Sequence, residues 1–311
     1  MSDITLSRTN ALDHAIEIAA AETKITMAVA HPADFNSLSG AVDAAKNNII
    51  EPILVGPASR IMRLADEHDI DLTDIKIVDS LHSHESAAIA TGMARTGEVQ
   101  SLMKGSLGSS EILSAIFSRS EGLRTERRMS HIFALDCAEH YHKPLFVTDA
   151  AINVTPDLNA KRDITQNAIN FCQCMGIETP KVAVLAAVEK VKASMVSTLD
   201  AAALCKMADR KQITGGELDG PLAFDNAICR QAAIDKGIAS NVAGDADILL
   251  APDLEAGNMI AKQQIYMANA KSAGLVLGAK VPVVLTSRAD NAYSRMASAA
   301  LAALVAHHQV K

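Results

Sequence analysis

The sequence predicts an α/β protein of two domains, in which parallel or mixed sheets are flanked by helices. Short β-branched runs alternate with helical stretches, as is typical of parallel sheets covered by helices. The length of 311 residues suits two domains of roughly 150 residues each. Hydrophobic residues make up 49% of the chain and aromatic residues only 3%, so the core must be aliphatic. Such cores suit helices packed on parallel strands.

The first elements follow one another at short intervals. Residues 24–32 (KITMAVAHP) favour a strand that ends in a loop, and residues 36–46 favour a helix. A second strand is predicted at residues 51–57, a helix at residues 60–68 and a third strand at residues 74–80 (DIKIVDS). This βαβαβ order predicts a parallel sheet.

The alternation continues to the C-terminus. Further strands are predicted at residues 143–147, 181–185, 248–251 and 281–285, and helices at residues 164–175 and 259–270. No Gly/Ser-rich or Pro-rich linker is present, but GLRTERRMS interrupts the apolar pattern near residues 126–130. We expect a first, discontinuous domain of residues 1–126 and 274–311, and a second domain of residues 127–273.

Composition and charge argue against several classes of protein. The net charge of −7 and an isoelectric point of about 5.8 argue against a nucleic-acid partner. The N-terminus lacks the basic start and apolar core of a signal peptide, and no apolar run is long enough to span a membrane. The five cysteines fit reduced thiols, and the CxC of Cys172 and Cys174 lacks the second pair of a zinc site. We therefore expect a cytoplasmic protein with no metal site.

A glycine-rich stretch, LMKGSLGSSEIL, precedes a predicted helix. Gly105 and Gly108 permit a tight backbone, and Ser109 or Ser110 could cap the helix. The free N–H groups at a helix start, with Lys104 beside them, would make a phosphate cradle. The alternative is an ordinary glycine turn followed by a helix cap.

Three arginines lie close together in GLRTERRMSHIF: Arg124, Arg127 and Arg128. A run of charges is usually a solvated face. In an acidic chain, however, arginines near a domain junction could bind phosphate through two hydrogen bonds. His131 comes next and precedes an apolar segment, which favours a structural role over contact with a substrate.

Polar residues also follow predicted strands. Asp149, in VTDAAINVTPD, comes directly after an apolar strand, where ligand-facing residues of parallel sheets usually lie, although it could equally be a cap. In LLAPDLEAGNMIAKQ, Gly257 and Asn258 mark a turn, and Asn258 could cap the next helix. In VPVVLTSRAD, a polar turn at residues 286–290 joins a strand to a helical segment and could bind an anion.

Taken in order, these stretches resemble the phosphate acetyltransferase/phosphate butyryltransferase family. The matching motifs are LMKGSLGSS, LRTERRMSHIF, VTDAAINVTPD, GPLAFDNAI, APDLEAGNMIAKQ and VPVVLTSRAD, which together span most of the chain. The LTSRAD form and the GLRT…SH segment look closer to the butyryl-type branch. The motifs GxSxG, HExxH and GxGxxG are absent, so hydrolase, zinc-protease and dinucleotide-binding interpretations lose their usual support.

The resemblance implies a two-domain fold like that of isocitrate and isopropylmalate dehydrogenases, with the active site in the interdomain cleft and usually a homodimer. It implies a reversible reaction in which an acetyl- or butyryl-type acyl-CoA and phosphate give acyl phosphate and CoA in a ternary complex. CoA is a substrate here, and no metal or other cofactor is implied. The thiolate form of CoA is the nucleophile, so the site needs a base and positively charged donors.

The family's Ser–Arg pair falls on Ser287 and Arg288. Ser287 would contact the reacting groups, while Arg288 would hold phosphate or stabilise the charge on the acyl oxygen. Acetyl-type members place a catalytic aspartate where this chain has Ser294. Asp290 is therefore the nearest candidate for the base, and His131 is a weaker one.

A second departure concerns phosphate. Acetyl-type members place a phosphate-binding arginine where this chain has Ser114, and Arg124 could replace that contact. Seven residues in the matching motifs are predicted to bind substrate: Lys104, Gly105, Ser109, Arg124, His131, Asp149 and Asn258.

Two alternatives stay open at this point. The serines at 294 and 114 motivate a catalytically silent protein of the same fold that binds CoA or acyl phosphate. A decarboxylating dehydrogenase of similar fold is less favoured, since no helix carries a convincing pair of metal-binding aspartates. From the short stretch before the first strand, we expect that the hydratase-like domain of some relatives does not precede it here.

Overall fold

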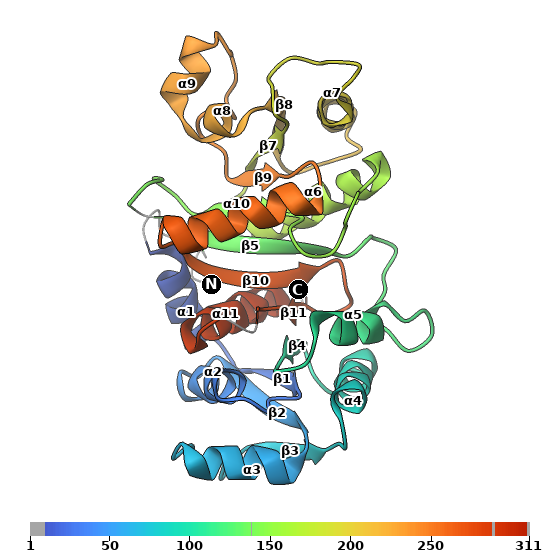
Figure 1. Cartoon of the computed structure of the whole chain (residues 1–311), viewed down its shortest axis with the longest axis vertical. Coiled ribbons are helices and arrows are strands. Elements are labelled where there is room, and N and C mark those ends of the chain that lie inside the picture. Colours follow the sequence, from blue (N-terminus) through green and yellow to red (C-terminus); the bar gives the residue numbers. More distant parts are fainter. Residues whose placement is uncertain (1–9, 138, 288–289, 310–311) are drawn as a thin grey trace. The chain divides into compact units, whose positions relative to one another are not determined.

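The computed structural model describes residues 10–137, 139–287 and 290–309 (Figure 1). The chain divides into two compact units: unit 1 contains Arg128–Ser272, and unit 2 contains Leu12–Arg127 with Ala273–Lys311. Each unit is built from mainly parallel strands with helices packed on them, which confirms the predicted α/β class. No helix in the described ranges is long and apolar enough to cross a membrane.

The strands of unit 2 form a sheet in the order β3-β2-β1-β4-β11-β10. They are β1 (Ile25–Ala30), β2 (Ile50–Gly56), β3 (Lys76–Asp79), β4 (Ser101–Lys104), β10 (Lys271–Leu277) and β11 (Val283–Val284). All run parallel except β10, which is antiparallel to β11. The carboxyl ends of β1, β4 and β11 consequently meet at one edge of the sheet, the edge at which parallel α/β sheets carry their ligand sites.

Six helices belong to unit 2 for all or nearly all of their length. They are α1 (Ala11–Ala21), α2 (Phe35–Lys46), α3 (Ala58–Glu67), α4 (Ser83–Thr96), α5 (Ser109–Phe117) and α11 (Ala292–Gln309). Figure 1 shows α2 and α11 on one side of the strands and α4 and α5 on the other. Helices α2 and α11 approach closely at Gly40, where a Cβ atom would lie 2.9 Å from the Cβ of Arg295. Glycine is needed there because Arg295 occupies the space.

Unit 1 has a sheet in the order β5-β6-β9-β7-β8. Its strands are β5 (Ser130–Asp136), β6 (Leu145–Thr148), β7 (Lys181–Leu185), β8 (Glu217–Leu222) and β9 (Ile248–Leu250), and its helices are α6 (Leu158–Cys174), α7 (Val196–Asp209), α8 (Phe224–Ile228), α9 (Arg230–Asp235) and α10 (Leu254–Met267). Strands β6, β9, β7 and β8 are parallel, and β5 is antiparallel to β6. Buried aliphatic side chains from these elements form the core.

The predicted elements agree with the structure except at certain boundaries. Strand β7 has the predicted bounds, and the first three strands lie within the predicted ranges to about one residue. Helix α10 begins at Leu254 rather than at Met259, because the Asp253 carboxylate accepts the Ala256 N–H (2.8 Å) and caps the helix there. The strand predicted at residues 281–285 is only Val283–Val284.

Candidate active site

The turn that follows β11 carries the predicted catalytic residues. Thr286 is buried and Ser287 is exposed, so the chain reaches solvent at this point. The Ser287 N–H donates to Oδ2 of Asp290 (2.7 Å), and the Asp290 N–H donates to the Ser287 carbonyl (3.2 Å). These two bonds close the turn and hold the Asp290 carboxylate beside Ser287. Arg288 lies outside the described residues.

Lys104, at the end of β4, joins this turn. Its side chain is 1% exposed, and its Nζ donates to the carbonyl oxygens of Thr286 (3.2 Å) and Gly105 (3.3 Å). Strands β4 and β11 are parallel neighbours, with Met103 paired to Val284. The pairing therefore brings the LMKGS and LTSRAD motifs together, although they are far apart in the sequence.

Gly105 allows the chain to pass very close to the backbone at the end of β1. A Cβ atom at this position would lie 2.5 Å from the carbonyl oxygens of Ala30 and His31. The Gly105 N–H donates to the Ala30 carbonyl (2.8 Å), and the Ser106 N–H donates to the His31 carbonyl (2.9 Å). Any side chain would prevent this approach, so the motif requires glycine here.

A second buried cation, Arg295 of α11, supports the same turn. It is fully buried, and its Nη1 donates to Thr286 Oγ1 (2.8 Å) and to the Lys104 carbonyl (3.2 Å). Its Nη2 donates to the Ser287 carbonyl (3.1 Å). Within the described ranges, no carboxylate pairs with Arg295, and its Nε has no hydrogen-bond partner. Burial lowers the pKa of this guanidinium, which nevertheless stays charged at neutral pH.

Arg295 belongs to none of the motifs from which the site residues were predicted. The available signal was a single arginine within the Ala-rich segment that follows LTSRAD. Its neighbour Ser294, the residue at the family's aspartate position, is also buried, and its N–H donates to Oδ1 of Asn291 (2.9 Å).

The start of α5 is organised by a carboxylate rather than by serines. Glu111 accepts the Gly108 N–H (2.8 Å) and the Ser83 hydroxyl, and these hydrogen bonds, first from Ser83 and then from Gly108, lower the pKa of Glu111. Gly108 occupies the N-cap position, while Ser109 and Ser110 are the first, exposed residues of the helix. The prediction that one of these serines caps α5 is therefore wrong.

Arg124 contacts its neighbours through backbone hydrogen bonding. It forms an isolated antiparallel bridge with Ala279, and the flanking Lys280 N–H donates to the Leu123 carbonyl (2.9 Å). Its side chain is exposed and has no hydrogen-bond or ion-pair partner in the described part of the chain. The guanidinium is consequently available to an anion.

In unit 1, Asp149 organises the loop that follows β6. It is 3% exposed, and Oδ1 accepts the N–H groups of Ala151 (2.9 Å) and Ile152 (3.0 Å). Oδ2 accepts both the N–H (3.2 Å) and the Nδ2 (2.5 Å) of Asn153. Asp149 thus fixes the conformation of its own loop. It is not a helix cap, because Asp157 caps α6.

Two further side chains support the Asp149 loop. Arg128 Nε donates to Asn153 Oδ1 (2.5 Å), so one arginine of the basic run serves this loop. Asn258 Nδ2 donates to the Ala150 carbonyl (3.0 Å). A Cβ atom at Gly257 would lie 2.4 Å from the Asp149 carbonyl oxygen, so α10 packs directly on the loop.

Asn258 and His131 have surroundings that the sequence did not reveal. Asn258 lies inside α10, after its first turn, so the prediction that it caps this helix is wrong. His131 lies on β5 and is 1% exposed, with its ring packed edge-on against Phe133 at a centroid distance of 4.5 Å. Its carbonyl accepts the Thr148 hydroxyl (2.8 Å), which links β5 to β6.

Comparison with known proteins identifies the family. Residues 82–303 match the family described as phosphate acetyl/butaryl transferase. The chain belongs to this family and is a phosphate acyltransferase, as the motifs predicted.

Individual relatives match nearly the whole chain. A phosphate acetyltransferase of Rhizobium meliloti is 54% identical over 294 residues, which cover 94% of this chain and 93% of that protein. A phosphate butyryltransferase of Clostridium acetobutylicum is 42% identical over 283 residues, covering 91% and 93%. Overall identity therefore does not support the motif-based preference for the butyryl-type branch.

A solved structure supports the fold. A branched-chain phosphotransacylase from Enterococcus faecalis matches with a TM-score of 0.77 and 26% identity, covering 91% of this chain and 99% of that one. The catalytically silent alternative finds no support among these relatives.

Proposed function

We propose that this chain transfers a short acyl group, acetyl or butyryl, reversibly between CoA and inorganic phosphate. In the direction of acyl-CoA synthesis, the CoA thiol loses its proton and its sulfur bonds to the carbonyl carbon of the acyl phosphate. The carbon–oxygen bond to phosphate then breaks and phosphate leaves with the electron pair. One observation carries the proposal: Lys104 and Arg295 converge behind the Ser287 turn at the carboxyl edge of parallel strands.

The charge at this edge suits the reaction. Negative charge develops on the acyl oxygen and the departing phosphate, and preorganised positive donors stabilise it more in the transition state than in the ground state. Arg288 would supply the donor that touches these oxygens, and Ser287 would contact the reacting groups. Lys104 and Arg295 are buried behind the turn and contribute a positive potential from there. Lys104, which the motif predicts to bind substrate, would then act through this potential rather than by direct contact.

Asp290 is the proposed base. A free thiol ionises near a pKa of about 8.5, so little thiolate exists at neutral pH without help. A positioned base contributes roughly 10²- to 10⁴-fold. The hydrogen bond from Ser287 N–H to Asp290 Oδ2 fixes this carboxylate next to the residue that would contact the substrate.

Arg295 is proposed as a positioning residue. Its three hydrogen bonds bind the Lys104 and Ser287 carbonyls and the Thr286 hydroxyl, so it connects the end of β4 to the catalytic turn. Each acceptor would lose one hydrogen bond if the guanidinium were removed, and a buried group left unsatisfied costs about 1–3 kcal/mol. Arg295 therefore acts on catalysis through the position of Ser287.

The remaining substrate contacts are proposed at the other predicted residues. Arg124, with its exposed and uncompensated guanidinium, is suited to phosphate, and Gly105 and Ser109 stand beside the N–H groups at the start of α5. In unit 1 we propose His131, Asp149 and Asn258, the last two through the loop that they hold together. We further propose a homodimeric cytoplasmic enzyme that needs no metal, so EDTA should leave the rate unchanged.

The test is phosphate-dependent release of free thiol from acyl-CoA. Purified protein is incubated with acetyl-CoA or butyryl-CoA and phosphate, and thiol is followed with a chromogenic disulfide. Release that requires phosphate supports the enzyme, whereas tight CoA binding without release would overturn the proposal. The ratio of kcat/KM for the two substrates then defines the acyl specificity, since a hydrophobic pocket discriminates one methylene by about 1–3 kcal/mol.

A further inference from the structure

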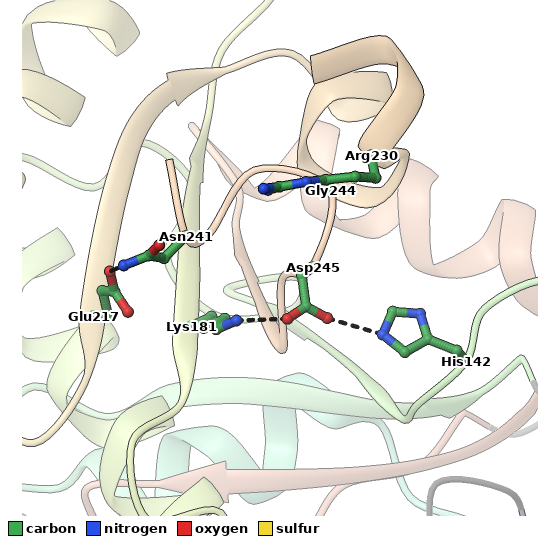
Figure 2. A pocket seen from close by; sticks show the side chains of 7 residues that line it. All are labelled: His142, Lys181, Glu217, Arg230, Asn241, Gly244 and Asp245. Atoms are coloured by element: carbon green, nitrogen blue, oxygen red, sulfur yellow. Dashed lines mark hydrogen bonds and ion pairs between the residues drawn. The ribbon is translucent and has the colours of Figure 1, made fainter. Parts of the chain in front are cut away.

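Unit 1 contains a polar cavity whose lining includes none of the residues proposed for acyl transfer. Its volume is about 560 Å³. Figure 2 shows the charged and polar side chains that line it, among them His142, Lys181, Glu217, Arg230, Asn241 and Asp245. Volumes of about 300–1,000 Å³ are typical of small-molecule sites.

The cavity lies at the amino ends of the parallel strands of unit 1. Lys181 and Glu217 are the first residues of β7 and β8, while His142 and Asp245 shortly precede β6 and β9. Asp149 follows the last residue of β6. The cavity and the Asp149 loop therefore lie at opposite edges of one sheet, separated by the length of β6, about 13 Å.

Asp245 is already neutralised by basic side chains. His142 Nε2 (2.8 Å) and Lys143 Nζ (3.1 Å) contact Oδ1, and Lys181 Nζ contacts Oδ2 (2.5 Å). Lys143 also pairs with Asp247 (2.7 Å). Burial of Asp245 opposes its ionisation, but the hydrogen bonds from Lys181, Lys143 and His142 prevail and hold its pKa well below the usual range. The Asp245 carboxylate is therefore occupied by protein side chains and is not available to a ligand.

Arg230, by contrast, is oriented but not neutralised. Its Nη1 donates to the carbonyl oxygens of Ser240 (3.0 Å) and Ala243 (2.8 Å). Gly244 makes this possible, since it has a φ of 78° and a Cβ atom there would lie 2.4 Å from the Arg230 Cα. Across residues 10–137, 139–287 and 290–309, no carboxylate pairs with this guanidinium. Figure 2 shows it reaching over Asp245 into the cavity.

The other side of the cavity presents acceptors and an amide. Glu217 Oε1 accepts the Asn241 Nδ2 (2.8 Å), and no cation of the described chain pairs with this carboxylate. An acidic side chain hydrogen-bonds sugar hydroxyls in nucleotide-binding sheets. The imidazole of His142 is the one ring among the lining residues, so the cavity offers little surface on which a base could stack.

We propose that this cavity binds a phosphorylated sugar or polyol. Arg230 receives the phosphate through its uncompensated N–H groups, because a guanidinium matches phosphate with parallel hydrogen bonds. Glu217 and Asn241 receive the hydroxyl groups. The ligand thus fills both ends of the cavity, which neither inorganic phosphate nor a free sugar would do.

Calorimetric titration of the whole protein with ribose 5-phosphate tests the proposal, with ribose and inorganic phosphate as partial ligands. Ribose 5-phosphate should bind more tightly than either. Both Arg230→Gln and Glu217→Gln should weaken its binding by about tenfold or more, the effect of losing a charged hydrogen bond. Both variants should keep wild-type acyl transfer. Lys206→Gln, which alters an exposed ion pair on α7, serves as the matched control and should bind normally.

The proposed acyl-transfer site also takes phosphate, so Arg288→Ala separates the two sites. Retained ribose 5-phosphate binding in Arg288→Ala supports the cavity. Binding that is lost in Arg288→Ala but kept in Arg230→Gln, or no binding at millimolar ligand, overturns it. Equal affinity for inorganic phosphate also overturns it. If Arg230→Gln fails to fold, Glu217→Gln tests the proposed cavity site instead. This variant leaves intact the hydrogen bonds from Arg230 to the Ser240 and Ala243 carbonyls.

Discussion

The two units place opposite charges at the same topological position. In unit 2, the carboxyl ends of β4 and β11 are held by the buried cations Lys104 and Arg295, which donate to carbonyl and hydroxyl oxygens. In unit 1, the carboxyl end of β6 is held by the buried carboxylate of Asp149, which accepts backbone N–H groups. At both edges, hydrogen bonds to backbone groups help to satisfy a buried charge.

Whether the buried charge is positive or negative depends on which backbone groups each loop points toward the interior. A turn that presents carbonyl oxygens to the interior needs hydrogen-bond donors, and a loop that presents N–H groups needs acceptors, because an unsatisfied buried polar group is costly. Here cations supply the donors in unit 2 and a carboxylate supplies the acceptors in unit 1. Only the cationic edge leaves positive potential for a phosphate or an oxyanion. We therefore expect substitutions at the unit 2 edge to affect mainly kcat, and substitutions at the unit 1 edge to affect mainly stability and the KM for substrate.

The largest effect is expected from Arg288→Ala. Loss of one preorganised donor to the developing charge should lower kcat/KM by about 10²- to 10³-fold. Initial rates of thiol release measure it. Arg63→Ala, which removes an exposed arginine of α3, is the control and should keep full activity. If Arg288→Ala kept wild-type rates, the proposal that this edge stabilises the developing negative charge would be wrong.

Arg295→Ala should come next, with kcat lowered by roughly 10- to 100-fold, since the turn loses hydrogen bonds worth about 1–3 kcal/mol when unmade. The KM for acyl-CoA should change less than kcat, because Arg295 does not contact the substrate. Guanidinium ion at millimolar concentration, far below denaturing levels, should restore part of kcat by occupying the vacated site. A purely structural role predicts the reverse, with fewer folded molecules, an unchanged kcat per folded molecule and no rescue.

Asp149→Asn probes the acidic edge. The amide replaces one acceptor oxygen with a donor that faces N–H groups, so the free energy of unfolding should fall by about 1–2 kcal/mol. Urea unfolding monitored by circular dichroism measures this change. Asp209→Asn disrupts only an exposed pair with Lys206 and should change stability little. A large loss of kcat in stable Asp149→Asn protein would contradict the division of roles between the edges.

The smallest effect concerns pH. The pKa of Asp245 is depressed in the folded protein, so its contribution to stability is present above the unfolded pKa of about 3.9 and is lost as the pH falls below that value. Asp245→Asn should therefore reduce the fall in unfolding free energy between roughly pH 5 and pH 3. Urea unfolding across this range measures the slope. If unfolding free energy depended on pH equally in both proteins, the basic side chains around Asp245 would not be stabilising its ionised carboxylate in solution.

Much of the fold was accessible from local patterns, and the errors occur where a distant or longer side chain intervened. The β7 segment KVAVL is a continuous apolar run, so its bounds follow from composition. Ser109 looked like a cap, but Glu111 reaches back to the Gly108 N–H and takes that role. Asn258 looked like a cap because it follows a glycine, whereas Asp253, five residues earlier, accepts the N–H that starts the helix.

The sequence by itself determined the alternation of strands and helices, the family, and the motifs that end each strand. These properties depend on residues that are near neighbours in the chain. Only the tertiary structure decided that Lys104 and the Ser287 turn meet, because parallel pairing of β4 with β11 brings their carboxyl ends together. It also decided the role of Arg295, since a guanidinium in an Ala-rich helix becomes a support for the turn only when α11 packs against the end of β4.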